Sequence, residues 1–104
     1  MTDDRAMAGG LTLAFVGFAR ETAARARAYE DAVLALLPDH GARVLFRGHR
    51  APGEDRGLPA EVHILWFPDR IRFDSFLADP RRAELLASHG QVFDDTVVVE
   101  LEPR

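Results

Sequence analysis

Hydrophobic residues recur along the chain with two periods, one near 3.6 residues and one near two, which are typical of helices and strands respectively. Helical spacing covers residues 22–37, with Thr22 as a candidate N-cap. Pro38 lacks a backbone donor and Gly41 can adopt a positive φ, so we expect the helix to end there. The period of two predicts strands at residues 11–18, 42–50, 61–67 and 96–101.

A second helical stretch follows the third strand and is interrupted. Asp69 is a candidate N-cap, and the helix it begins is expected to have an inner face that includes Ile71 and Phe73. Asp79 and Pro80 have the residue types preferred at an N-cap and at a first helical position. The pattern therefore predicts one helix, broken and restarted at Asp79-Pro80, before the last strand.

The order of the predicted elements is β-α-β-β-α-β, which favours an α+β, ferredoxin-like fold with a four-stranded antiparallel sheet and both helices on one face. Strands 11–18 and 61–67 are apolar on both sides, as central strands are. The sheet face without helices would then be apolar as well, and we expect a homodimer to cover it. Residues 1–10 are expected to form a disordered N-terminal tail and residues 11–104 a single ferredoxin-like domain.

Composition narrows the function by exclusion. A net charge of -4 and a pI near 5.5 argue against nucleic acid and anionic membranes as partners. The chain contains no apolar run of membrane-spanning length, and its acidic start is unlike a signal peptide, so a cytoplasmic location is expected. The absence of Cys, Lys and Asn removes thiolate and Schiff-base chemistry and one common oxyanion donor.

Five short motifs occur in a characteristic order between residues 11 and 101. They are Tyr29, His40-Gly41, Arg47-Gly48, Phe67-Pro68 and Asp79-Pro80. Their order and spacing resemble the dimeric α+β barrel superfamily and, within it, a small bacterial family of unknown function. Two residues depart from the pattern: Ala42 stands where a second Gly is usual, and Trp66 where an acidic residue is common. The superfamily includes cofactor-independent monooxygenases, lactone isomerases, haem enzymes and ligand-binding modules, so the resemblance implies a fold more than an activity.

The predicted site depends on how the second and third strands pair. Pairing counted from the 51–60 loop places Arg47 opposite Ile64 and Leu45 opposite Trp66, on the face toward the partner subunit. A slip of one residue, or a bulge, would exchange the two faces. The expected cavity lies between the two sheets and is lined by Arg43, Arg47, His49, Ile64, Trp66, Val98 and Glu100. The ligand-binding candidates among these residues are Arg47, His49, Trp66, Glu100 and Arg43.

Each candidate also has a structural interpretation. Arg47 and Glu100 are equally compatible with an interfacial ion pair, and Trp66 with packing. His63 is flanked by apolar residues and is interpreted as a core histidine with a local hydrogen bond. His40 and His89 each precede a glycine that ends a helix. A positive charge at that end interacts favourably with the helix dipole, so both are interpreted as capping residues.

No metal or cofactor is predicted, because the four histidines lack ligand spacing and no phosphate-binding loop is present. Three functions stay open, and catalytic residues stay unknown. The first is a homodimer with an interface pocket for a small anionic or aromatic ligand. The second is a cofactor-independent monooxygenase or isomerase, with Arg47 holding an anionic substrate and His49 or Glu100 moving the proton. The third is a non-catalytic interaction module with a filled cavity.

Overall fold

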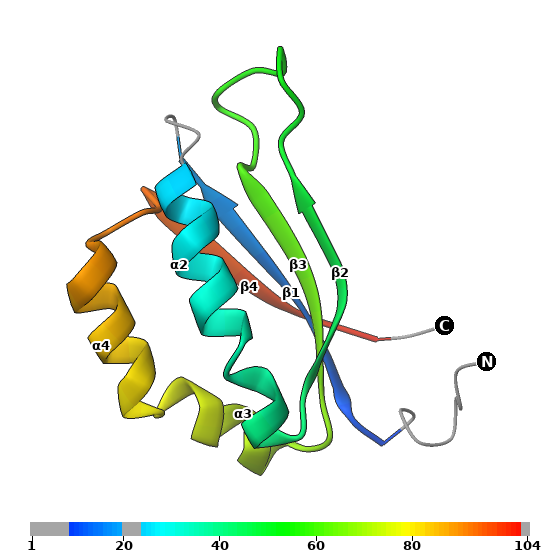
Figure 1. Ribbon diagram of the computed structural model, residues 1–104. Coiled ribbons are helices and arrows are strands. Elements are labelled where there is room, and N and C mark those ends of the chain that lie inside the picture. The colour runs from blue at the N-terminus through cyan, green and yellow to red at the C-terminus, as the bar shows by residue number, and fades with distance from the viewer. Residues whose placement is uncertain (1–8, 20–23, 103–104) are drawn as a thin grey trace.

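The computed structural model describes residues 9–19 and 24–102 (Figure 1). Its elements, in chain order, are β1 (Leu11–Phe18), α2 (Ala24–Leu34), η1 (Leu37–His40), β2 (Arg43–His49), β3 (Glu61–Phe67), α3 (Arg70–Leu77), α4 (Pro80–His89) and β4 (Asp95–Leu101). The sheet order is β2-β3-β1-β4, and every neighbouring pair is antiparallel. This confirms the predicted ferredoxin-like α+β fold, with β1 and β3 at the centre. Most of the predicted tail and the expected N-cap Thr22 lie outside the described residues.

The helices begin and end where local chemistry requires. α2 ends at Leu34, three residues earlier than predicted, because the ring of Pro38 would clash with the carbonyl four residues before it. The chain continues through the short 3-10 helix η1 and leaves it at Gly41, whose φ of 67° is the left-handed conformation that glycine tolerates best. Both predicted N-caps are confirmed: Oδ1 of Asp69 accepts from the Arg72 amide at 2.7 Å, and Oδ1 of Asp79 from the Arg81 amide at 2.9 Å.

The prediction that Ile71 belongs to the inner face of α3 is wrong. Its side chain is 77% exposed, whereas Phe73 and Phe76 pack into the core. Residues two apart on a helix point almost in opposite directions, so Ile71 and Phe73 do not share a face. The core itself lies between the sheet and the helices, and its main cluster of buried residues is Leu13, Val33, Leu37, Ala42, Leu65, Phe67 and Phe76.

The helices α2 and α4 cover one face of the sheet, and no helix of the described chain covers the other (Figure 1). We call this second surface the bare face. Val97, Val99 and Leu101 of β4 lie on it, and so does Phe46 of β2, which is 56% exposed. An apolar surface of this kind is unusual on a protein that has no partner.

A β-bulge changes the register of the β2–β3 hairpin. Arg43 pairs with Trp66 and Val44 with Leu65, but Phe46 then pairs with Ile64, so Leu45 is the extra residue. Side chains alternate between the faces of a strand, and one inserted residue therefore reverses every position beyond it. The predicted pairing of Arg47 with Ile64 is wrong for this reason. Arg47 instead pairs with His63 and lies on the helix-covered face.

No helix of the described ranges has both the length and the apolar character needed to cross a membrane.

Candidate functional site

The five ligand-binding candidates do not converge. Arg43 and Trp66 share the bare face, with the guanidinium carbon of Arg43 5.4 Å from the centroid of the Trp66 ring. Arg47, His49 and Glu100 occupy register positions of the opposite, helix-covered face. The alternative of an Arg47–Glu100 ion pair is not found within the single chain, where Glu100 accepts from Arg70 of α3 at 2.8 Å.

Arg47 instead belongs to a group of charged side chains beneath α2, which we call the buried cluster: Glu30, Arg47, Glu61 and His63. His63 is 1% exposed, and its Nε2 lies 3.1 Å from Oε1 of Glu61, two residues away. Its Nδ1 lies 3.2 Å from Oε2 of Glu30 on α2. Nε of Arg47 donates to the same Glu61 Oε1 at 3.2 Å. The interpretation of His63 as a core histidine with a local hydrogen bond is therefore confirmed.

The contacts of His63 limit where the protons of the buried cluster can lie. A neutral imidazole carries one N–H, yet each nitrogen of His63 faces a carboxyl oxygen. Two arrangements fit this geometry: a doubly protonated His63 between two carboxylates, or a protonated Glu30 that faces Nδ1 of a neutral His63. The two arrangements differ by moving one proton between Glu30 and His63, across a heavy-atom separation of 3.2 Å.

The two glutamates of the buried cluster have pKa values displaced in opposite directions. Burial raises the pKa of Glu30 from 4.5 to about 7; nearby His63 opposes this change and the charge of Glu61 adds to it. Burial also acts against ionisation of Glu61, but the hydrogen bond and charge of His63, together with Arg47, lower its pKa. Paired titratable groups whose environments separate their pKa values are typical of acid–base sites.

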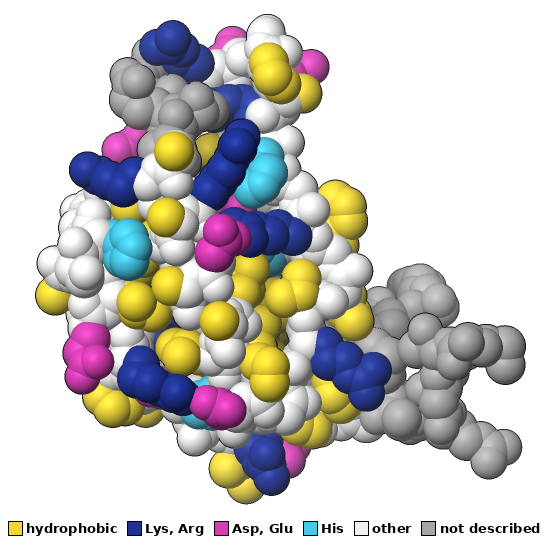
Figure 2. Space-filling model, in the orientation of Figure 1, with side chains coloured by type: hydrophobic (Ala, Val, Ile, Leu, Met, Phe, Trp, Pro, Cys, Tyr) yellow, Lys and Arg dark blue, Asp and Glu magenta, His cyan; other side chains and the backbone are white. Residues whose placement is uncertain are grey.

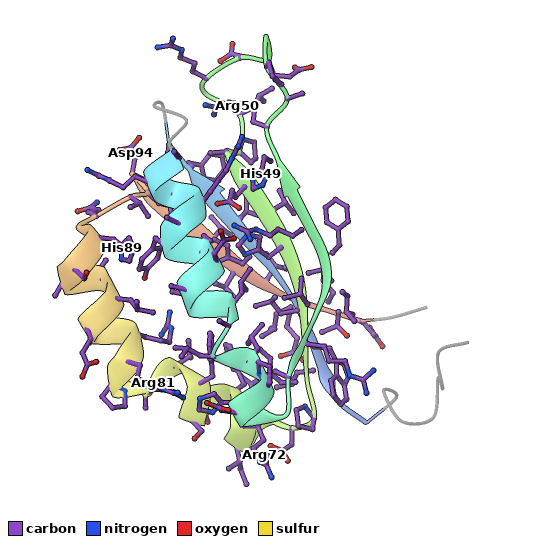
Figure 3. All side chains as sticks on the ribbon, viewed as in Figure 1. His49, Arg50, Arg72, Arg81, His89 and Asp94 are labelled. Atoms are coloured by element: carbon purple, nitrogen blue, oxygen red, sulfur yellow. The ribbon has the colours of Figure 1, made fainter. Side chains whose placement is uncertain are left out.

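The buried cluster connects to the surface along β2. The guanidinium of Arg47 binds Asp31 and donates to the carbonyl oxygen of Arg27 at 3.3 Å. Nδ1 of His49, which is half-exposed, lies 3.2 Å from Oε1 of Glu61, and Figure 3 places His49 near the loop end of β2. Polar groups thus run from the protein interior to solvent, as a path for protons requires.

On its inner side the buried cluster borders a cavity of about 280 Å³ between the sheet and the helices α2 and α4. Its apolar walls include Phe15, Val33, Leu65, Phe76, Leu86 and Phe93. Its polar lining consists of Tyr29, Glu30, His63, Arg82, Gln91 and Thr96. Hydrophobic side chains are exposed over the middle of the molecular face that carries these helices (Figure 2).

Aromatic packing positions the cavity against His63. The ring of Phe15 stacks on the imidazole, with 5.4 Å between centroids, and Phe93 meets Phe15 edge-on at 5.7 Å. Phe93 can lie there because Gly17 has no side chain: a Cβ at Gly17 would be 2.6 Å from the Phe93 ring. A second hollow, of about 360 Å³, lies beside the 51–60 loop and reaches His49 and Glu61.

Within residues 9–19 and 24–102, no three His, Asp or Glu side chains are grouped so that they could hold a metal ion. The two glutamates of the buried cluster contact His63, and Glu61 also contacts Arg47.

Sequence reasoning missed Glu30, although a signal was present. Ala26, Glu30, Val33 and Leu37 are spaced by four, three and four residues, which is one helix face, and all four are buried. A glutamate in the middle of an apolar stripe is unusual, because burying a carboxylate is costly unless it is paired or protonated. Arg82 was also missed, since helical periodicity does not distinguish a cavity wall from a solvated surface.

No family model and no curated protein matches the sequence. Solved structures do match. RPA0582 of Rhodopseudomonas palustris, a protein of unknown function, is 18% identical with a TM-score of 0.71, over 93% of this chain and 84% of that one. Rv0793 of Mycobacterium tuberculosis is 17% identical with a TM-score of 0.61, over 91% of this chain and 94% of that one. An uncharacterised NIPSNAP domain protein of Burkholderia xenovorans is 17% identical with a TM-score of 0.59, over the same shares. These likenesses show a shared compact α+β fold.

Proposed function

We propose that the protein binds a small molecule in the cavity between the sheet and the helices, and that Glu30 exchanges a proton with it. The observation that carries this proposal is that Glu30 and His63, both buried and 3.2 Å apart, line the same cavity. A carboxyl group with a pKa near 7 is populated in both protonation states at neutral pH, as an efficient general acid or base must be.

The other members of the buried cluster support this role. Glu61, kept ionised by His63 and Arg47, stabilises an imidazolium at His63, so His63 can take the proton from Glu30 and return it. Removing and replacing a proton at carbon is the chemistry of an isomerase and requires no cofactor. Among the enzyme activities of the superfamily that the sequence resembles, we therefore favour isomerisation over oxygenation.

Deuterium exchange tests the proton transfer without knowledge of the natural substrate. A panel of small ketones and lactones is incubated with the protein in D₂O, and loss of the acidic C–H signal is followed by NMR. We expect exchange for at least one compound and a loss of roughly 10²–10⁴-fold in Glu30→Gln. The control is Glu84→Gln, which removes an exposed carboxyl group of α4. Exchange that is as fast in Glu30→Gln as in the wild type would contradict the proposal.

We further propose that a second copy of the chain covers the bare face, which gives a homodimer of the dimeric α+β barrel type. Supporting this, apolar residues of all four strands lie on that face. The charged residues Arg43 and Asp95 each begin an edge strand, and because β2 and β4 run in opposite directions they lie at opposite ends of the sheet. A patch that is apolar at its centre can pair with its own copy about a two-fold axis. In this arrangement the ligand lies inside each chain, not between the two sheets as predicted.

Sedimentation of two charge variants tests the dimer. Phe46→Glu adds a charge to the bare face at a position that is exposed in the single chain, so the subunit itself should still fold. We expect it to sediment as a monomer at micromolar concentration. Ala24→Glu, on the exposed first turn of α2, is the matched control and should stay dimeric. A wild-type protein that is monomeric under these conditions would exclude the proposed assembly.

A further inference from the structure

Arg82 is the arginine of the cavity lining. Its Nη1 donates to the carbonyl oxygen of Leu77 at 3.0 Å, but its Nε is buried and has no hydrogen-bond partner among the described residues. Arg82 also forms no ion pair within those ranges. Its neighbour Arg81 differs, since Arg81 binds both Asp79 and Asp39. A buried guanidinium N–H without an acceptor is costly, and an ion or a water that accepts its hydrogen bond removes that cost.

The position of Arg82 fits an anion inside the cavity. Its guanidinium carbon lies 4.9 Å from the centroid of Phe76, another wall residue, so the planar fork is held against an aromatic ring. Tyr29 and Glu30 line the same cavity as Arg82. A guanidinium presents paired N–H groups that match the two oxygens of a carboxylate.

We propose that Arg82 binds the carboxylate of a small ligand whose apolar body packs among Phe15, Phe76 and Phe93. This inference rests on the proposed function and narrows its substrate class to small compounds that also carry a carboxylate. The volume of about 280 Å³ is near the lower end for ligand pockets, so the ligand is small, of the size of a single-ring arylacetate. The group that the sequence assigned to an anion, Arg47, is already bound by Asp31 and Glu61, which leaves Arg82 for the ligand.

The test compares two probes that have the same shape and different charge, phenylacetate and phenylacetamide. Binding to the wild-type protein is measured by calorimetric titration, and the ring signals of Phe76 and Phe93 are followed by NMR to locate the probe. We expect phenylacetate to bind at least tenfold more tightly than the amide. Arg82→Gln should remove this preference, while Arg82→Lys, which keeps the charge without the fork, should keep part of it.

The matched control is Arg72→Gln, which removes an exposed arginine at the α3 end of the molecule and should leave the preference unchanged (Figure 3). Circular dichroism verifies that each variant is folded, and the two-probe comparison in the wild type needs no variant. Equal binding of both probes, or a preference that survives in Arg82→Gln, would overturn the role of Arg82 and leave the cavity as a binding site. If neither probe moves the ring signals, both the carboxylate inference and binding in this cavity are wrong.

Discussion

Two clusters of the same residue types lie at opposite ends of the molecule and behave differently. The buried cluster contains one histidine, one arginine and two acidic residues. A corner cluster, where η1 meets the start of α4, also contains one histidine, one arginine and two acidic residues: Asp39, His40, Asp79 and Arg81. Figure 3 shows Arg81 at this corner, far from His49 at the other end. Composition alone does not distinguish the two.

The difference lies in how many donors each carboxyl group receives. In the corner cluster, Oδ1 of Asp79 accepts from the amide and the Nε of Arg81 at 2.9 and 3.1 Å. Oδ2 accepts from Nη2 of Arg81 at 2.7 Å and lies 2.8 Å from Nε2 of His40. These bonds, chiefly those of Arg81 and then that of His40, hold the pKa of Asp79 well below its usual range. The fully bonded carboxylate caps α4 and stays ionised.

In the buried cluster, the carboxyl oxygens do not all receive a hydrogen-bond donor. Three groups converge on Oε1 of Glu61, while its Oε2 has no hydrogen-bond partner among the described residues. Among the residues that the structure describes, Glu30 faces one ring nitrogen, and it holds its proton up to about pH 7. A carboxylate with many donors thus suits a structural role, and one with few donors beside a cavity suits the proton exchange proposed for Glu30.

The largest effect is expected from Arg47→Met. This variant removes one of the three groups that lie on Oε1 of Glu61, which is 3% exposed, and breaking a buried ion pair by removing one partner costs about 3–5 kcal/mol. Urea denaturation should show that loss in the free energy of unfolding. The double variant Arg47→Met/Glu61→Leu should recover most of it. A single variant as stable as the wild type would show that the buried cluster does not need its arginine.

The next effect separates the two clusters by pH. The pKa of Glu30 is higher in the folded than in the unfolded chain. Between about pH 4.5 and 7, Glu30 is therefore protonated in the folded state and ionised in the unfolded state. The free energy of unfolding falls as the pH rises through that range. Relative to Glu30→Gln, the wild type should lose about 3 kcal/mol of unfolding free energy between pH 4 and pH 8. Parallel stability curves for the two proteins would mean that Glu30 titrates normally.

A smaller effect with the opposite pH dependence is expected at the corner. Asp79→Ala removes the N-cap of α4 and should lower the melting temperature by roughly 5 °C, whereas Asp79→Asn keeps an acceptor for the Arg81 amide and should lose less. Because the folded pKa of Asp79 is depressed, the advantage of the wild type over Asp79→Asn is present above about pH 4 and is lost as pH falls further. An advantage that persists in strong acid would contradict the assignment.

The smallest effect is expected from Arg70→Met. Its ion pair with Glu100 is exposed on both sides, and such pairs contribute about 0–1 kcal/mol. Its unfolding free energy should lie within about 0.5 kcal/mol of the wild-type value in urea denaturation. A larger loss of unfolding free energy would show that ion pairs on the surface contribute as much to stability as those in the buried cluster.

Local signals in the sequence predicted the fold well. The bounds of β1 and β3, the caps at Asp69 and Asp79, and the order of the sheet all follow from residue periodicity and from the few residues that end or begin a helix. These features depend on neighbours within about four residues, which the sequence displays directly.

The site could not be predicted in the same way. Its geometry depends on the bulge at Leu45, which no Gly or Pro marks, and on contacts between α2 and β3 that are more than thirty residues apart in the chain, as with Glu30 and His63. The correct interpretation of His63 was local, since its partner Glu61 is two residues away. The role of Arg47 could not be inferred from neighbouring residues, since its partners Asp31 and Glu61 come from other elements.

The size of the cavity depends on Gly17, a residue that a single mutation can change. Every glycine codon becomes an alanine codon by one nucleotide change, and that change would add a methyl group 2.6 Å from the Phe93 ring, which forms part of the cavity wall. The ring would then have to move, and the space available to a ligand would change with it. Relatives that differ at this one position are therefore expected to accept substrates of different size while keeping the same acid–base residues.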